Sequence, residues 1–471
     1  MPKNNSTKEI TLALNRRRFI YYSAIAASAA AITGCASSTP RRIKSANEKL
    51  NIGSIGVGGK GSSDLDGAAA DNNIVALCDV DETTLSKAAQ KYPGAKLYRD
   101  YRKMFDEQKD LEAVTVSTPD HQHFHASMMA IQRSKHVYCQ KPLTHTIWEA
   151  RELTKAARKY KVATQMGNQG HSHFGNRELC EMIWSGAIGA IREVHCWTNR
   201  PIWPQGMNRP SGQDPVPANL DWDLWIGPAP MRPFVKTWPE NDQLQYKRAN
   251  RPVYHPFAWR GWWDFGCGAL GDMGCHVLDG PNWALSLEDP TSVGIVESSP
   301  LFKESAPEWA ILRYEFPQRR LKGNDSLAPA LTLMWYDGGK QPKRPDEMSK
   351  DLPESGSLFI GSKGKIVADT YGMNLSLLPE SKMKDYVKPP PTIPRIPDNN
   401  PYFDWIRACK GGPAACSNFD VAGPFSEMVL LGNLTLRAGK TIEWDGKNMR
   451  AKNLPEADQF IRTPYRQGWT V

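Results

Sequence analysis

The sequence predicts an α/β protein with a doubly wound parallel sheet in its N-terminal part and a second domain after it. Segments typical of strands and helices alternate from residue 50 to 167, as in a parallel sheet that helices cover on both faces. From residue 168 to 445 the pattern changes to long loops and β-rich segments. With 471 residues, the chain is long enough for two or more domains with their own cores.

A glycine-rich turn opens the first domain. An apolar run leads into Gly56, Gly58 and Gly61, spaced as Gly-x-Gly-x-x-Gly before a helical segment. The first glycine permits a tight turn, the second lets backbone N–H groups approach a pyrophosphate, and the third lets the helix lie close to the strand. Together with Gly59 and Lys60 in the same turn, they predict a dinucleotide site in a Rossmann domain.

The next strand ends in an acid. Ile74–Asp79 is apolar up to its last residue, and Asp79 stands where a carboxylate is expected, about 20 residues beyond the turn. A carboxylate at this place binds a ribose 2′-hydroxyl and repels a 2′-phosphate. We therefore expect NAD, and not NADP, as the cofactor.

Capping signals and periodicity define the other elements of this domain. Asp81 is placed to cap one helix, and Thr146-Ile147-Trp148-Glu149 is a capping-box signature that opens another. We expect helices over Asp81–Lys91, His123–Arg133 and Thr146–Tyr160, and strands over Ala113–Ser117, Val137–Cys139 and Val162–Met166.

Residues that directly follow strands should face the ligand, because ligands bind beyond the carboxyl ends of the strands in such sheets. Thr118, Pro119 and His123 follow one strand, and Gln140 and Lys141 follow the next. A lysine at a strand end is usually a solvated surface residue. The crevice position and the following proline favour instead an electrostatic or proton-transfer role for Lys141.

Tryptophans are concentrated after the first domain. Half of the sixteen lie between Trp197 and Trp263. Flat aromatic faces stack on sugar rings, so the cluster favours a carbohydrate cleft, with Trp262 and Trp263 as candidate substrate contacts. The alternative is that these rings pack a loop-rich core or a subunit interface. Asn168 is a further candidate contact for the cofactor and the substrate.

A second group of candidate residues lies on a helix that follows several glycines. Asp272 and His276 are four residues apart and therefore share one helix face. A carboxylate beside an imidazole can fix its tautomer and tune its pKa toward neutrality, which suits a general base. The alternative is an aspartate that caps the helix and a histidine that is satisfied in the core.

The last third of the chain is β-rich and contains one late helix. The proline-rich run Pro389–Pro401 is typical of a linker, and residues 446–471 read as a polar tail. We expect strands over Trp309–Phe316 and Leu331–Tyr336, a hairpin of Leu358–Gly361 with Lys365–Asp369, and a helix over Ala422–Arg437.

The first 38 residues resemble an export signal. Arg16 and Arg17 precede an apolar stretch, Phe19–Ile32, that is too short to span a bilayer. The paired arginines resemble the twin-arginine signal of proteins exported in the folded state, and the segment that ends in Cys35 resembles a lipobox with Cys35 as the lipidated residue. The alternative is a plain cleaved signal. We expect a periplasmic protein with an N-terminal lipid anchor, and a polar tether over 39–49.

Charge and cysteine content argue against several classes of site. The net charge of +9 is modest and comes partly from the leader, so it does not predict nucleic-acid binding. The nine cysteines show no C-x-x-C and no spacing typical of a metal site, so we expect no metal. Cys409 and Cys416 are close enough in sequence to pair, or they remain free thiols.

Three motifs between Leu50 and Asp445 are similar to those of the glucose-fructose oxidoreductase / inositol dehydrogenase (Gfo/Idh/MocA) family: the glycine triplet, Lys141-Pro142 and Asp272-x-x-x-His276. The resemblance implies a Rossmann domain and then an α/β domain whose open, mostly antiparallel sheet often mediates homo-oligomerisation. It also implies that Lys141 contacts the substrate and the nicotinamide region, that His276 takes the hydroxyl proton, and that Asp272 assists it.

The same resemblance places Thr118, Pro119 and His123 beside the cofactor. The chain departs from the family at residue 140, because the usual Glu-Lys-Pro is here Gln-Lys-Pro. Gln140 therefore lacks the negative charge that normally precedes the lysine. Asn168 matches the family pattern more loosely.

These observations predict an exported enzyme that oxidises a hydroxyl of a sugar or glycoside, at C3 as in exported relatives. Free NAD is not expected outside the cytoplasmic membrane, so the cofactor should be bound before export and held tightly. The first alternative is a redox-neutral, NAD-dependent glycosidase. The second is a carbohydrate-binding lipoprotein without catalytic activity.

Overall fold

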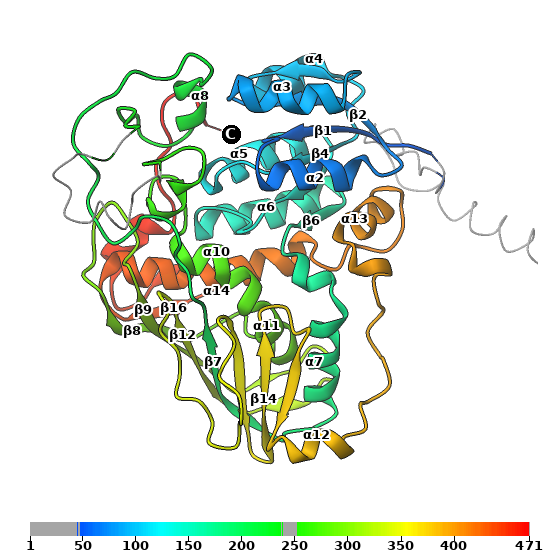
Figure 1. The fold of residues 1–471 in the computed structure, drawn as a ribbon, viewed down its shortest axis with the longest axis vertical. Helices are drawn as coiled ribbons and strands as arrows, with labels where there is room; N and C mark the ends of the chain where they lie inside the picture. Colours follow the sequence, from blue (N-terminus) through cyan, green and yellow to red (C-terminus); the bar gives the residue numbers. More distant parts are fainter. Residues whose placement is uncertain (1–44, 46–47, 237, 239–251, 471) are drawn as a thin grey trace, which may run out of the picture. The chain divides into compact units, whose positions relative to one another are not determined.

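The computed structural model describes residues 45, 48–236, 238 and 252–470. The predicted export signal with Cys35, and most of the predicted tether, lie outside the described residues. In these ranges no helix is long and apolar enough to cross a membrane. The described chain forms two large sheets with helices packed against them (Figure 1).

The first sheet has six parallel strands in the order β3-β2-β1-β4-β5-β6. Ile52 of the central strand β1 pairs with Ile74 on one side and Ala113 on the other. The strand order reverses between β1 and β4, which places a ligand crevice at their carboxyl ends. The predicted α/β fold is confirmed: strands β1 (Asn51–Ile55), β2 (Asn73–Cys78), β3 (Lys96–Tyr98), β4 (Ala113–Val116), β5 (His136–Cys139) and β6 (Thr164–Met166) alternate with helices α2 (Lys60–Ala69), α3 (Glu82–Lys91), α4 (Tyr101–Glu107), α5 (Asp120–Gln132) and α6 (Ile147–Tyr160).

Two helix starts in this domain are confirmed in detail. The Asp81 side chain caps α3 by accepting a hydrogen bond from the Thr83 N–H at 2.9 Å. At α6, Thr146 and Glu149 form the predicted capping box, and both side chains are buried. Such local signals are readable because the capping partners lie within one turn of each other.

Helix α5 starts at Asp120, three residues before the predicted start at His123. The polar side chains of its first turn are buried against a segment more than 100 residues later in the chain. The His121 ring lies 3.1 Å from the Trp225 carbonyl oxygen, and Gln122 donates to the Leu224 carbonyl at 2.8 Å. Sequence periodicity cannot report burial by such distant contacts, so the turn reads as a loop.

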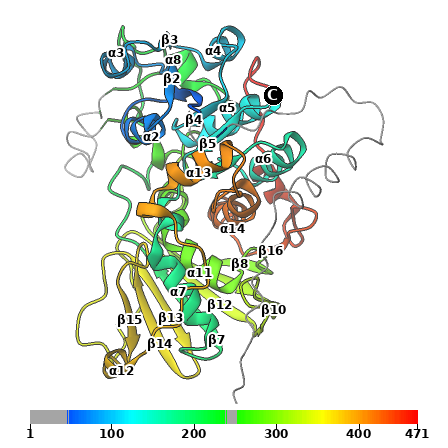
Figure 2. The same ribbon diagram turned by 90° about the vertical axis from the view of Figure 1, so that its right-hand side faces the viewer.

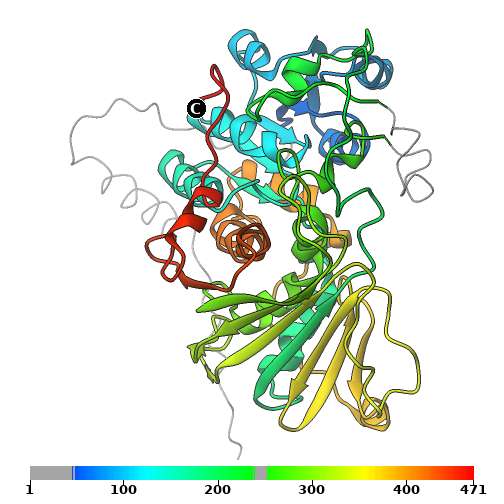
Figure 3. The same ribbon diagram turned by 90° about the vertical axis from the view of Figure 1, so that its left-hand side faces the viewer.

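The second sheet has nine strands in the order β15-β14-β13-β7-β12-β9-β8-β16-β17 (Figure 3). One pair of described strands in it, β7 with β12, is parallel and the others are antiparallel. The predicted hairpin is confirmed as β13 and β14. The strands are β7 (Ile191–Trp197), β8 (Ser292–Ser298), β9 (Ala310–Phe316), β12 (Leu331–Tyr336), β13 (Gly356–Gly361), β14 (Gly364–Asp369), β15 (Leu375–Leu378), β16 (Ile442–Asp445) and β17 (Arg450–Ala451); β10 (Arg319–Arg320) and β11 (Leu327–Ala328) form a separate pair.

Helix α14 lies between the two sheets (Figure 2). Helix α14 packs against α6 of the first domain and against α10, so it joins the two halves. Asn418 caps α14, which begins at Phe419, three residues before the predicted Ala422. The helices after the first domain are α7 (Phe174–Trp184), α8 (Trp222–Ile226), α10 (Gly268–Val277), α11 (Asp279–Leu285), α12 (Ser381–Asp385), α13 (Pro401–Cys409) and α14 (Phe419–Ala438).

Late segments return to the first domain. Helix α13, which the sequence did not predict, packs on α2. The Trp469 ring lies 6.2 Å from that of Tyr101 and 4.2 Å from the guanidinium of Arg102. Residues 446–471 were expected to be a polar tail, and this is wrong for Trp469, which is buried. The sequence does not predict this burial, because the aromatic residues of this segment are widely spaced and show no periodicity.

Thr146→Ala should lower the free energy of unfolding by about 1 kcal/mol, because it leaves a buried helix N-terminus without its cap. Thermal or urea denaturation measures the change. Thr83→Ala is the matched control, since Thr83 is an exposed residue in the first turn of α3 and should change stability by less than about 0.5 kcal/mol. Equal losses in the two variants would contradict the role of the capping box.

Candidate cofactor and active site

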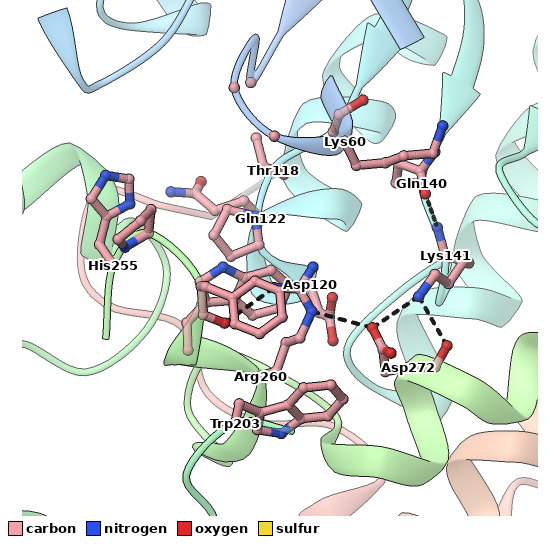
Figure 4. A pocket seen from close by; sticks show the side chains of 18 of the residues that line it. Lys60, Thr118, Asp120, Gln122, Gln140, Lys141, Trp203, His255, Arg260 and Asp272 are labelled. Atoms are coloured by element: carbon pink, nitrogen blue, oxygen red, sulfur yellow. Dashed lines mark hydrogen bonds and ion pairs between the residues drawn. The ribbon is translucent and has the colours of Figure 1, made fainter. Parts of the chain in front are cut away.

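A cavity of about 1080 Å³ lies at the carboxyl ends of the parallel strands. Its lining combines residues that follow β1, β2, β4 and β5 with residues of the loops between β7 and α10 and of the second sheet. Figure 4 shows how these side chains converge from elements far apart in the sequence. The cavity is where a doubly wound sheet is expected to bind its ligand.

The glycine-rich turn forms one wall of this cavity. Gly56 has a φ of +76°, and a Cβ there would lie 2.7 Å from the Ser117 carbonyl oxygen. A Cβ on Gly61 would lie 2.0 Å from the Gly56 carbonyl oxygen, so this position needs glycine for close packing. Gly58, Gly59 and the start of α2 at Lys60 face the cavity, and α2 has no side-chain cap. An uncapped helix N-terminus behind a glycine turn fits a pyrophosphate.

Asp79 lies at the ribose end of the cavity. Its carboxylate accepts hydrogen bonds from the Val57 N–H at 2.9 Å and from the Asp81 N–H at 3.0 Å. Burial raises the pKa of Asp79, and these two hydrogen bonds oppose the rise. The carboxylate is thus fixed against the glycine turn, as expected of the acid that selects NAD.

Lys141 and Asp272 meet in the cavity although they are 131 positions apart. The Lys141 Nζ lies 2.9 Å from Asp272 Oδ1 and donates also to the Asp272 carbonyl oxygen at 2.9 Å. Arg260 Nε donates to the same Oδ1 at 3.2 Å (Figure 4). Although burial acts in the opposite direction, the charges of Lys141 and Arg260 hold the pKa of Asp272 well below its usual value.

His276 lines the cavity one helical turn after Asp272. Its Nδ1 is buried and has no hydrogen-bond partner among the described residues. Burial lowers the pKa of His276 to about 3, and the charge of Lys141 adds to this, while Asp272 raises it. The expected tuning toward neutrality is therefore not what the structure has, because burial and the charge of Lys141 outweigh the attraction of Asp272. The imidazole is neutral and able to accept a proton.

Two charged residues of this site were missed in the sequence. Arg260 is the second cation on Asp272. Asp120 lines the cavity, is almost fully buried and accepts a hydrogen bond from the Cys267 N–H at 3.0 Å. Burial raises the pKa of Asp120 to about 7 against the attraction of Arg260 and Lys141. Asp120 directly follows Thr118 and Pro119, so its position after a strand was a usable signal, whereas Arg260 carried none.

The other predicted cofactor residues divide into two groups. Thr118, Pro119 and Gln140 line the cavity. His123 and Asn168 lie behind the lining: the His123 ring nitrogens are 2.8 Å from the Pro142 carbonyl oxygen and 2.9 Å from that of Thr118, and Asn168 Oδ1 accepts from Ser417 Oγ at 2.6 Å. Both are buried, and His123 holds the backbone of Thr118 and Pro142 in place.

The predicted substrate tryptophans are not in the cavity. Trp262 is fully buried in a separate aromatic core and donates to the Val253 carbonyl at 2.7 Å, and Trp263 is buried in the main core. The alternative, packing of a loop-rich core, therefore holds for these two rings. The tryptophans that do line the cavity are Trp203, Trp225, Trp259 and Trp469.

The two cysteines that were candidates for a disulfide are not joined to each other. Cys409 is buried in α13 and Cys416 is partly buried near Ser172. The alternative, that the two remain thiols, therefore holds for this pair.

Gly58→Ala should weaken NAD binding by at least about tenfold, because the new Cβ would lie 2.7 Å from Thr84 Cγ2 and would hinder the approach of a pyrophosphate. Titration of the purified protein with NAD, followed by tryptophan fluorescence, measures the affinity. Gly94→Ala is the control, since a Cβ there meets open space. Unchanged affinity in Gly58→Ala would show that the pyrophosphate lies elsewhere.

Comparison with known proteins agrees with this geometry. Inositol 2-dehydrogenase of Salmonella typhimurium is 31% identical over 151 residues, which are 31% of this chain and 45% of that protein. D-glucoside 3-dehydrogenase of Escherichia coli is 30% identical over 123 residues, 26% of this chain and 34% of that protein. The chain thus matches less than half the length of these curated relatives.

The fold has solved counterparts. The WlbA dehydrogenase from Bordetella pertussis, in complex with NADH and UDP-GlcNAcA, superposes with a TM-score of 0.56 at 15% identity, over 84% of this chain and 99% of that one. Residues 50–168 match the oxidoreductase family with an NAD-binding Rossmann fold, and residues 190–319 match its C-terminal alpha/beta domain. The glycine turn, Asp79 and two matched domains together show that the chain belongs to the Gfo/Idh/MocA oxidoreductase family and carries its NAD-binding domain.

Proposed function

We propose that the protein is an exported NAD-dependent dehydrogenase that oxidises a hydroxyl of a sugar or glycoside. The observation that carries this proposal is the meeting of Lys141, Asp272 and His276 in the cavity that the glycine turn also lines. A base, a cation and a cofactor site within one cavity are what oxidation of a secondary alcohol requires, since the proton leaves the O–H group and the hydride leaves the C–H group of the same carbon.

The residues divide this chemistry between them. His276 is neutral, so it can take the proton of the substrate hydroxyl. Lys141 stabilises the negative charge that develops on the substrate oxygen, and Asp272 and Arg260 fix the position of its ammonium group. Bound NAD supplies the acceptor for the hydride. Thr118, Pro119 and Gln140 form the cavity wall next to the glycine turn.

Several names among the relatives support a cyclic polyol or glycoside as the substrate class. They include enzymes named for inositol and for D-glucoside, the second as a 3-dehydrogenase. This supports C3 of a glycoside as the position oxidised. Trp203 and Trp259 in the cavity wall offer the aromatic faces on which a sugar ring can stack.

We also propose that NAD stays bound through many turnovers. The leader, with Arg16, Arg17 and Cys35, supports export of a folded lipoprotein to the periplasm. At the Asp79 end of the cavity, later segments of the chain contact Asp81: Asn219 Nδ2 donates to Asp81 Oδ1 at 2.7 Å, and His255 Nε2 lies 3.2 Å from Asp81 Oδ2. These contacts support a cofactor that is held tightly. A hydride taken from one sugar must then be returned to a sugar. Assembly into a homo-oligomer stays a prediction.

Two alternatives are kept because the cavity also suits them. In a redox-neutral glycosidase, transient oxidation acidifies the neighbouring C–H and the aglycone is eliminated. Release of nitrophenol from a nitrophenyl glycoside without net NADH would favour it. A carbohydrate-binding lipoprotein would show no reduction of NAD with any sugar. Purified protein that releases no nicotinamide on denaturation would contradict the retained cofactor.

Lys141→Ala and His276→Ala should each lower sugar-dependent reduction of bound NAD by at least about a hundredfold, because they remove the cation and the proton acceptor. Absorbance at about 340 nm, where NADH absorbs, measures reduction across a panel of sugars and glycosides. His195→Ala is the control, since His195 lies in β7 outside the cavity. Activity near that of the wild type in both variants would refute the dehydrogenase assignment.

The rate of NAD reduction should rise with pH through about 7 and become flat in Asp120→Asn. The raised pKa of Asp120 keeps it neutral below about 7 and charged above, and a negative charge in the cavity that His276 also lines should favour uptake of a proton by the imidazole. His276 itself is neutral throughout this range because its pKa is about 3. An unchanged pH profile in Asp120→Asn would assign the titration to another group.

A further inference from the structure

The acid missing from residue 140 has a counterpart elsewhere in the fold. Asp64 lies on α2, and its side chain is fully buried. Both of its carboxylate oxygens accept from Gln140 Nε2, at 3.0 and 2.9 Å. A buried carboxylate is costly unless it is paired and hydrogen-bonded, so a contact of this kind is a specific feature of the site.

Three more donors converge on Asp64. Lys60 Nζ lies 2.7 Å from Oδ1, the Tyr402 hydroxyl donates to Oδ1 at 2.8 Å, and Ser117 Oγ donates to Oδ2 at 2.6 Å. One carboxylate therefore joins the glycine turn, the ends of β4 and β5, and helix α13. Of these residues, Lys60, Ser117 and Gln140 line the cavity.

The contact also fixes the orientation of the Gln140 amide. Because Nε2 donates to Asp64, Oε1 must point the other way, and it lies 3.4 Å from the Lys141 backbone nitrogen. Asp64 thus acts on the segment from which the Lys141 side chain extends to Asp272. A Cβ on Gly167 would lie 2.5 Å from Gln140 Nε2, so the amide has no room to move away.

We propose that Asp64 is a positioning residue that supplies, from α2, the negative charge that is absent from residue 140 at the end of β5. Asp64 acts through Gln140 on Lys141, and through Lys60 and Ser117 on the glycine turn. The role of Lys141 is that of the proposed function, whereas the effect on the glycine turn depends only on NAD binding.

Exchanging the two side chains tests this proposal. In Gln140→Glu, two carboxylates would lie about 3 Å apart and would repel each other when both are ionised, so the contact forms only while the pair holds one proton. We expect NAD affinity and sugar-dependent NAD reduction to fall at least about tenfold at pH 8 and to recover as the pH is lowered. The sign follows because like charge raises the pKa of the pair, and the site is intact only below that pKa.

Asp64→Asn should lower both quantities as well, because Lys60 loses its ion pair and the amide of Gln140 loses its anchor. The double variant Asp64→Asn/Gln140→Glu restores one carboxylate facing one amide. It should bind and reduce NAD within about threefold of the wild type, without the alkaline loss of Gln140→Glu. Asp66→Asn is the matched control on the same helix, since Asp66 pairs with Lys91 on the surface.

The other groups around Asp64 do not produce this pH dependence. In the wild type Asp64 faces one cation, Lys60. Burial raises the pKa of the nearby tyrosines and thiol and lowers that of the nearby histidine, so these groups stay uncharged near neutral pH. They are Tyr138, Tyr402, Cys139 and His123.

The readouts separate this proposal from the proposed function. NAD affinity, from tryptophan fluorescence, needs no sugar, so it tests the exchange even if no sugar is oxidised. A double variant no better than the worse single variant would overturn the proposal, and so would a Gln140→Glu variant that matches the wild type at every pH. If a single variant fails to fold, the double variant must still recover the fold and NAD affinity.

Discussion

The contact between Lys141 and Asp272 is the interaction on which the site depends, because it joins the end of β5 to helix α10 of the second domain. Each side chain is less than one-fifth exposed. Removing two charges from water is costly, and the pair offsets this cost only with additional hydrogen bonds. Arg260 and the Asp272 carbonyl oxygen supply them. The end of β5 and helix α10 are thus held at one fixed separation.

Around this pair the site is balanced in charge. Two cations, Lys141 and Arg260, face one ionised carboxylate and a second carboxyl, Asp120, whose charge depends on pH. His276 adds no charge. Charges are weakly screened where water is excluded, so this balance affects whether a developing charge on a ligand is stabilised.

Much of the fold could be predicted from the sequence because its signals are local. The glycine turn, the cap at Asp81 and the box at Thr146 each involve residues within a few positions of one another, and the structure has all three. Lys141 and Asp272 were identified as site residues by motif, and the structure brings them together. The contacts that failed to be predicted are long-range. Trp262 was placed in a substrate cleft, but tertiary packing buries it.

The convergence of distant segments has a consequence for how the protein is made. The cavity wall includes Gly58 and also Trp469, and Tyr402 completes the contacts of Asp64. N-terminal domains generally fold first during synthesis, yet here the first sheet lacks part of its cavity until residue 469 has left the ribosome. The first domain alone therefore does not contain the whole cavity, which is complete only after the second domain and Trp469 have been synthesised and packed against it.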